Sequence, residues 1–161
     1  MHRRDLLRFS VAASTFLAGA SLVGCSAQTA APGFQALRHD DLPLLRALIP
    51  VLLSGTLATD TLVLRSLDYK LAALSPEMLK LTRQLFDVLS LPLTRGPLTG
   101  IWGAWAQAAP AQVEAFLQRW QGSSLNLLRM GHASLLQLLQ MAWYERPESW
   151  AACGYPGPPK I

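Results

Sequence analysis

Residues 124–144 read SLNLLRMGHASLLQLLQMAWY, and this stretch predicts the longest helix of the chain. Its apolar side chains recur every three or four positions, which places them on one face of a helix. That face holds Leu125, Leu128, His132, Leu135, Leu136, Leu139 and Trp143, and the opposite face holds Asn126, Arg129, Gln137 and Gln140. Such a helix is stable only when other elements cover its apolar face, so we expect helices packed around it.

The same spacing predicts two helices near the start of the mature chain. Asp40 or Asp41 can cap the first, which Pro50 kinks or ends. Thr59 or Asp60 can cap the second. The apolar stripe of the second helix is Leu64, Leu67, Leu71 and Leu74, with Arg65, Asp68 and Lys70 expected to face outward.

A third helix is predicted to begin at Ser75. Ser75 can cap it, Pro76 suits the first helical position, and Glu77 favours the positive end of the helix dipole. Its expected buried stripe is Met78, Leu81, Leu85 and Val88. The tight connection to the preceding helix predicts an antiparallel pair.

The rest of the chain is helical or irregular, and no β pattern is found. Residues 91–100 are expected to be irregular because two prolines and two glycines interrupt them. A helix is expected over 110–122 and a final turn at 147–150. The sequence therefore predicts a single all-α bundle of about five or six helices over 37–161, with an extended Pro/Gly-rich tail at 154–161.

The first 24 residues have the pattern of an export signal. Arg3 and Arg4 precede a mildly apolar stretch, 9–23, which is too short and too polar for a membrane-spanning helix. The segment resembles a twin-arginine signal, in which the paired arginines and Leu7 match the usual pattern. This resemblance implies that the twin-arginine (Tat) translocase exports the chain already folded to the periplasm.

Cys25 follows Leu22-Val23-Gly24, and the four residues resemble a bacterial lipobox. The resemblance implies that Cys25 is acylated and that residues 25–36 form a lipidated tether that holds the domain on the membrane. The alternative is an ordinary signal with a chance cysteine near its cleavage site. With Cys25 acylated, Cys153 has no intramolecular partner, which leaves an intermolecular disulfide, a reactive thiol or simple burial.

Composition argues against nucleic acid and for a protein partner. The formal net charge is +4, but three arginines and one aspartate of the signal supply +2 of it, which leaves about +2 for the mature part. Nucleic-acid binding therefore has little support. Because 51% of residues are hydrophobic and 15% are charged, we expect an apolar surface patch that contacts a partner.

No motif in the sequence indicates catalysis, a metal site or a cofactor site. The histidines of the mature part, His39 and His132, do not stand at metal-ligand spacing from cysteines or carboxylates. Phosphate-binding loops and nucleophile motifs are also absent from the sequence. We therefore expect neither a bound cofactor nor a catalytic residue in this chain.

Aromatic residues, proline and glycine gather near the end of the chain. The candidate partner-docking residues are Trp143, Tyr144, Trp150, Tyr155, Pro156, Gly157 and Pro158. Tyrosine and tryptophan are favoured binding anchors, and a tail rich in proline loses little entropy when it docks. The alternative is that this tail packs back over its own bundle, and the sequence favours neither arrangement.

The stretch from Pro110 to the end resembles the small subunit, subunit 3, of gluconate 2-dehydrogenase complexes. The resemblance rests on 113–120 (VEAFLQRW), 142–150 (AWYERPESW) and 154–158 (GYPGP). It implies a non-catalytic subunit that escorts a FAD-containing flavoprotein of the glucose-methanol-choline class through Tat export and stays assembled with it. A cytochrome c subunit is a further implied partner. The lipobox departs from the family pattern and favours a lasting membrane tether.

Two further hypotheses remain beside this one. The chain could be a stand-alone periplasmic lipoprotein that binds an apolar ligand or a lipid, which its composition allows. It could also be an enzyme, although no motif supports that reading.

Overall fold

The structure is a computed structural model that describes residues 29–157, and seven α-helices run through them. They are α2 (Asp41–Leu52), α3 (Asp60–Ala72), α4 (Pro76–Ser90), α5 (Pro92–Thr99), α6 (Pro110–Gln121), α7 (Asn126–Tyr144) and α8 (Pro147–Cys153), with a 3-10 turn η1 (Trp105–Gln107). The described residues hold one isolated β-bridge, between Ala30 and Arg38, and no sheet. The prediction of an all-α bundle is confirmed. The residues of the predicted signal and Cys25 lie outside the described part.

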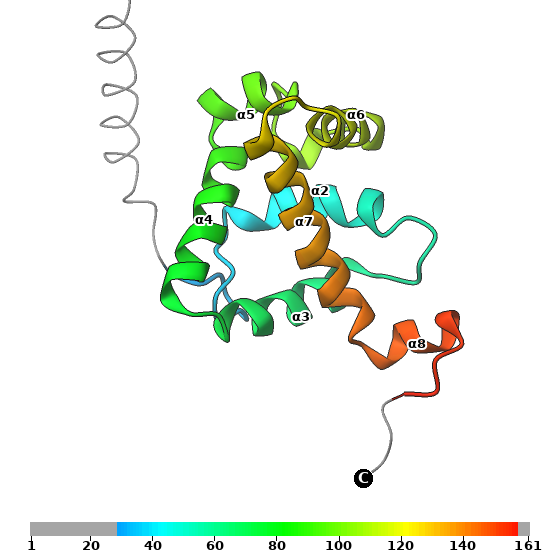
Figure 1. The fold of residues 1–161 in the computed structure, drawn as a ribbon. Helices are drawn as coiled ribbons and strands as arrows, with labels where there is room; N and C mark the ends of the chain where they lie inside the picture. Colours follow the sequence, from blue (N-terminus) through cyan, green and yellow to red (C-terminus); the bar gives the residue numbers. More distant parts are fainter. Residues whose placement is uncertain (1–28, 158–161) are drawn as a thin grey trace, which may run out of the picture.

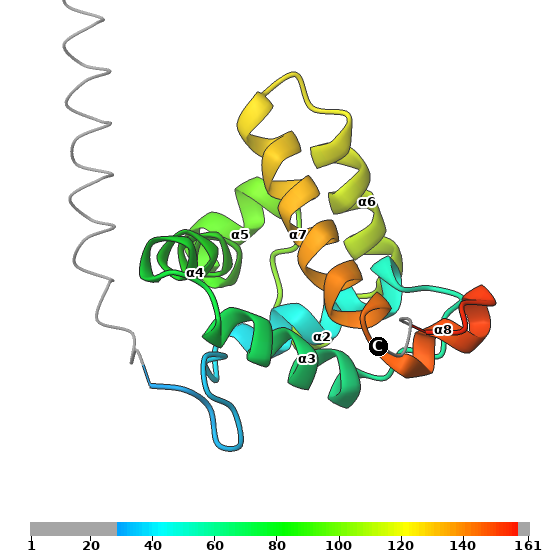
Figure 2. The ribbon, with the colours of Figure 1, turned by 60° about the horizontal axis from the view of Figure 1, so that its bottom comes forward.

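Helix α2 occupies the centre of the fold. It contacts α3, α4, η1, α6 and α7. Helices α6 and α7 run side by side in opposite directions, and α7 continues across α3 (Figures 1 and 2). The hydrophobic core therefore lies around α2. Its largest fully buried side chains include Leu44, Leu48, Phe86, Phe116 and Trp143.

A chain of aromatic rings joins α6 to the loop before it. Phe116 stands edge-on to both Trp105 and Trp120, with ring centroids 6.0 and 4.9 Å away. The indole N–H of Trp105 donates to the carbonyl of Leu89 at 2.8 Å, and that of Trp120 donates to the carbonyl of Leu98 at 2.9 Å. These bonds tie α6 and its preceding loop to α4 and α5, and they satisfy indole donors that would otherwise be buried without a partner.

The start of the described chain is fastened to the domain by Asp68. Its carboxylate accepts the backbone N–H groups of Gln35, Ala36 and Leu37, each at 2.8 Å. Asp68 is only 5% exposed, so the prediction that it faces outward was wrong. The described part of the expected tether, 29–36, consequently lies on the domain, with Ala31 and Ala36 buried.

A buried ion cluster holds the same segment against α4. The Arg38 guanidinium contacts Asp41 at 2.8 Å and Asp87 of α4 at 2.7 Å. Burial lowers the pKa of Arg38, but the hydrogen bonds and charges of these two carboxylates outweigh burial and raise it, so Arg38 stays charged. Asp40 makes no side-chain cap bond, and Asp41 instead accepts from the backbone N–H of Arg38. The predicted aspartate cap of α2 is therefore replaced by this cluster.

The prediction that helix breakers make residues 91–100 irregular was wrong. These residues contain α5, because Pro92 sits at its first position, where a proline costs no hydrogen bond. Gly100 then ends α5 with a φ of +74°, which glycine adopts without strain. The helix count rises to seven because α5 and α8 are complete short helices.

The predicted antiparallel pairing of the second and third helices was also wrong. Helix α3 packs chiefly on α7, whereas α4 packs on α2 and α5. Figure 2 shows α4 nearly end-on while α3 lies across the view. The Ser75 cap is confirmed, since its hydroxyl accepts from the Met78 backbone N–H at 3.3 Å. The cap begins α4 as predicted, and the turn before it sends α4 away from α3.

Candidate functional site

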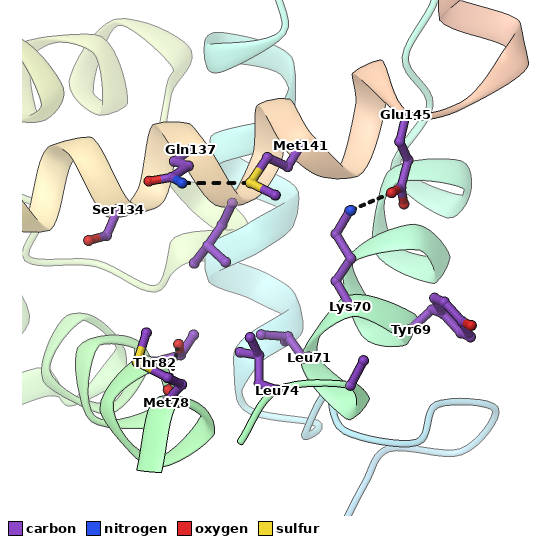
Figure 3. A pocket seen from close by; sticks show the side chains of 12 residues that line it. Tyr69, Lys70, Leu71, Leu74, Met78, Thr82, Ser134, Gln137, Met141 and Glu145 are labelled. Carbon is purple, nitrogen blue, oxygen red and sulfur yellow. Dashed lines mark hydrogen bonds and ion pairs between the residues drawn. The ribbon is translucent and has the colours of Figure 1, made fainter. Parts of the chain in front are cut away.

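An uncovered apolar groove lies between α4 and α7, with α3 and α5 at its ends. It consists of two adjoining cavities of about 510 and 540 Å³ that share Met78, Thr82, Ser134 and Leu138. We call it the α4–α7 groove. Figure 3 shows the first cavity from close by, with α7 above it and α3 and α4 below. No chain segment within residues 29–157 fills the space between the two helices.

The α4 wall of the groove is the stripe that was predicted to be buried. Met78 is 52% exposed, Leu81 is 60% and Val88 is 38%, so the prediction was wrong for these three. Leu85, the fourth member, is half-buried and packs against the core. The core side of α4 is formed instead by Phe86 and Leu89. Helix α4 thus has two apolar faces and its neighbours cover one. The sequence itself indicates the second face, because Phe86 and Leu89 are apolar residues of α4 that lie outside the predicted stripe.

Helix α7 forms the facing wall along most of its length, and the side chains of its first half are the more exposed. Leu127 is 78% exposed and Met130 is 58% exposed, whereas Leu135 and Leu139 further along are buried.

The first half of α7 also reaches the core, since Leu128 packs against it and Gly131 lies against the ring of Trp120. The second half likewise borders the groove, through Leu138 and Met141. The face predicted for residues 124–144 therefore meets the core along much of α7, while neighbouring side chains of the same helix line the groove.

Three methionines line the groove. Met78 lies at the junction of the two cavities, Met130 in the second and Met141 in the first. All three are at least half exposed. Methionine side chains are flexible and polarisable, and they line protein surfaces that adapt to apolar helices. The groove has the composition of a docking site for an apolar helix.

Charge is confined to one end of the groove. At the α3 end, the Lys70 ammonium forms an ion pair with Glu145 (Figure 3). The Ser66 hydroxyl donates to the same carboxylate at 2.7 Å. Partial burial raises the pKa of Glu145, but the bonds from Lys70 and Ser66 outweigh it and hold that pKa below its usual value. The second cavity has no charged side chain in its lining. The groove therefore suits an uncharged apolar segment.

The predicted aromatic docking residues separate into a buried and an exposed set. Trp143 is 2% exposed and lies in the core, so it is not available to a partner. Tyr144 and Tyr155 are about half exposed, at 46% and 49%. Pro156 is exposed and Gly157 is half-buried. Pro158 lies outside the described residues.

The described part of the tail folds back on α8. Trp150 meets Tyr155 edge-to-face at 5.6 Å, and its indole N–H donates to the carbonyl of Tyr144 at 3.1 Å. The ring of Trp150 also lies close to Gly157, whose φ of +99° suits glycine. The structure thus favours the arrangement in which this part of the tail packs on its own chain.

Residues 29–157 show neither a metal cluster nor a membrane-spanning helix. They contain no cluster of three or more histidine, cysteine or carboxylate side chains that could hold a metal ion. Among their helices, none is both long and apolar enough to span a membrane.

Comparison with known proteins gives no relative. No protein-family model, curated protein or solved structure matches this chain. Its function must therefore be inferred from its own residues.

Proposed function

We propose that this chain is a non-catalytic accessory subunit of a FAD-dependent alcohol or sugar dehydrogenase of the glucose-methanol-choline class. It carries the flavoprotein through Tat export by means of Arg3 and Arg4, stays assembled with it, and tethers the complex to the periplasmic membrane surface through a lipid on Cys25. FAD belongs to the partner and not to this chain.

The observation that carries the proposal is the uncovered α4–α7 groove. A small domain that exposes an apolar groove of this kind is expected to bind another protein. Its two walls are helices, its lining includes three methionines, and one of its cavities lacks charge. An amphipathic helix of the flavoprotein, laid lengthwise in the groove, would cover both walls.

Two features of the sequence support this class of partner. The motifs over 142–158 resemble those of the small subunits, and the twin-arginine pattern supplies an export signal of the kind used by folded proteins. A flavoprotein acquires FAD in the cytoplasm and must therefore cross the membrane folded. An accessory subunit that carries a Tat signal would allow the folded flavoprotein to be exported with it.

The export half of the proposal is tested by changing the signal. With Arg3→Lys and Arg4→Lys together, the co-expressed flavoprotein and its dehydrogenase activity should stay in the cytoplasmic fraction. Unchanged periplasmic activity with this variant would rule out the escort role.

The docking half is tested on the groove. Leu81→Glu with Leu127→Glu places charges on both walls and should abolish co-purification of the flavoprotein. The matched control is Leu57→Glu with Leu93→Glu, at sites 76% and 89% exposed that do not line the groove. Equal co-purification with both variants would place the docking surface elsewhere.

The groove also supports one alternative, a stand-alone lipoprotein that binds an apolar ligand or lipid. Each cavity falls within the roughly 300–1,000 Å³ that small-molecule sites occupy. Native mass spectrometry of the chain purified from its host separates the two functions. A protein partner supports the accessory subunit, and a monomer with bound lipid supports the alternative.

A further inference from the structure

We infer that, in the unprocessed chain, the apolar segment 9–23 of the export signal occupies the α4–α7 groove. The inference uses one part of the proposed function, the assignment of 1–24 as an export signal. It adds that the groove has an occupant before the flavoprotein arrives. The two would then compete for one site.

The segment and the groove match in charge. Residues 9–23 read FSVAASTFLAGASLV and contain no charged side chain. The larger cavity of the groove likewise has none in its lining, and the smaller has only the mutually paired Lys70 and Glu145. An uncharged segment can enter such a groove without leaving a charge desolvated and unpaired.

Length and chain connection also agree. A helix over residues 9–23 would have 15 residues, as α4 does. The described chain starts beside α4, where Arg83 donates to the carbonyl of Ala36 and Arg38 contacts Asp87 (Figure 1). Residues 24–28 can span at most about 17 Å, and half the circumference of a helix roughly 10 Å across is about 16 Å. A nearly extended connection is therefore long enough to pass around α4 into the groove.

Folding before export gives a reason for the signal segment to be covered. A chain that folds before export carries its apolar signal through the cytoplasm, where an exposed apolar segment promotes association. The groove offers cover for it within the same molecule. A flavoprotein helix that enters the groove would release the segment, so the translocase would meet the signal on loaded complexes in preference to empty ones.

Photo-crosslinking of the full chain tests the inference without a flavoprotein. The chain carries Arg3→Lys, Arg4→Lys and Cys25→Ser so that it stays unprocessed, and benzoylphenylalanine replaces Leu81 or Leu127 in the groove. Crosslinks within one molecule to residues 9–23 are expected from both positions. The same probe at Leu57, which is 76% exposed and does not line the groove, should give none.

A proteolysis measurement gives an independent readout. Chymotrypsin should cut after Phe9 and Phe16 about tenfold more slowly in the full chain than in its Leu81→Gln, Leu127→Gln variant, since cleavage follows the population of the open form. The Leu57→Gln control should keep the protection. Circular dichroism confirms that each variant is folded.

Any of three outcomes would overturn the inference. Absence of crosslinks from the groove to 9–23, or crosslinks equally strong from Leu57, would show that the segment does not occupy the groove. Crosslinks only between molecules would assign the groove to a second copy. All of these results leave the export test with Arg3 and Arg4 unaffected, so the two proposals fail separately.

Discussion

Asp68 controls how the start of the domain is held. One carboxylate, 5% exposed, accepts three consecutive backbone N–H groups from residues 35–37. Those N–H groups belong to a segment without helix or sheet, so they have no regular backbone partner. A charged acceptor binds such donors more strongly than a neutral one. The fold of the segment therefore depends on a side chain more than 30 positions away.

Replacing Asp68 should destabilise the protein severely. In Asp68→Ala, the buried N–H groups of Ala36 and Leu37 lose their acceptor at about 1–3 kcal/mol each, and the partly buried N–H of Gln35 loses its acceptor as well. We therefore expect a loss of about 2 kcal/mol or more in the free energy of unfolding. Asp68→Asn keeps one oxygen and should cost less. Urea denaturation measures both. The matched control Asp60→Asn, on the exposed start of the same helix, should change stability by less than about 0.5 kcal/mol.

The Glu145 carboxylate should make stability depend on pH. Its pKa is lowered in the folded chain, so its bonds to Lys70 and Ser66 contribute fully above the ordinary value of 4.5 and are lost as the pH falls through the lowered pKa. The melting temperature of Glu145→Gln should therefore lie below that of the wild type at pH 7, and the gap should close toward pH 3. A gap that stays constant over this range would contradict the assignment. Glu114→Gln serves as an exposed control.

At the scale of the elements, two glycines make room for tryptophan rings. A Cβ added at Gly131 of α7 would lie 2.5 Å from the ring of Trp120, and one added at Gly96 of α5 would lie 2.5 Å from the ring of Trp102. The two rings differ in freedom, since Trp120 is 3% exposed and held by its bond to Leu98, whereas Trp102 is 76% exposed. A Cβ added at these two glycines should therefore affect stability differently, although both would lie equally close to a ring.

Gly131→Ala should destabilise and Gly96→Ala should not. Alanine gains about 1 kcal/mol of helix propensity over glycine, but overpacking against a fixed ring costs about 1–3 kcal/mol. At Gly96 the exposed Trp102 ring can move aside, so only the gain in helix propensity remains. Thermal unfolding measures both variants. A Gly131→Ala protein as stable as Gly96→Ala would show that α6 and α7 can move apart freely.

Helix α4 should respond differently on its two faces. Phe86→Ala or Leu89→Ala removes core side chains that are at most 1% exposed and should cost about 2–5 kcal/mol. Leu81→Gln on the groove face should cost less than about 0.5 kcal/mol. Urea denaturation tests both. A large loss from Leu81→Gln would mean that the groove face is packed in the protein in solution.

At the scale of the whole molecule, the sequence predicted the elements better than their packing. The 3.6-residue spacing located α7 to within two residues at its start, and Ser75 marked the beginning of α4. Spacing shows which side chains share a face, but it does not show whether any element covers that face. Helix α4 has two candidate faces, and the choice between them depends on how α2 and α5 approach it.

The same limit applies to Asp68 and to the candidate site. A polar residue on a helix ordinarily faces water, and no local pattern marked the backbone donors of 35–37 as its partners. The groove was missed because its walls come from α4 and α7, which are more than 30 residues apart and connected through α5 and α6. The aromatic cluster near the end was found because it is contiguous in sequence.

The three methionines of the groove should report on whether it is open. Dilute peroxide should oxidise Met78, Met130 and Met141 while the chain stays folded, because each is at least half exposed. Mass spectrometry counts the sulfoxides and circular dichroism checks the fold. Protection of all three in the complex with the flavoprotein would locate the interface. Slow oxidation in the isolated mature chain would contradict an open groove.

Because residues 30–38 are held against α3 and α4, the distance between the bundle and a membrane that holds Cys25 is also limited. In a chain acylated at Cys25, the five steps from Cys25 to Ala30 reach at most about 17 Å. The bundle would then hang within that distance of the lipid headgroups, with the α4 side toward them and the α8 side away. A tethered subunit of this design would keep a bound partner close to the bilayer, so electrons leaving a flavin in that partner would have only a short distance to reach an acceptor in the membrane.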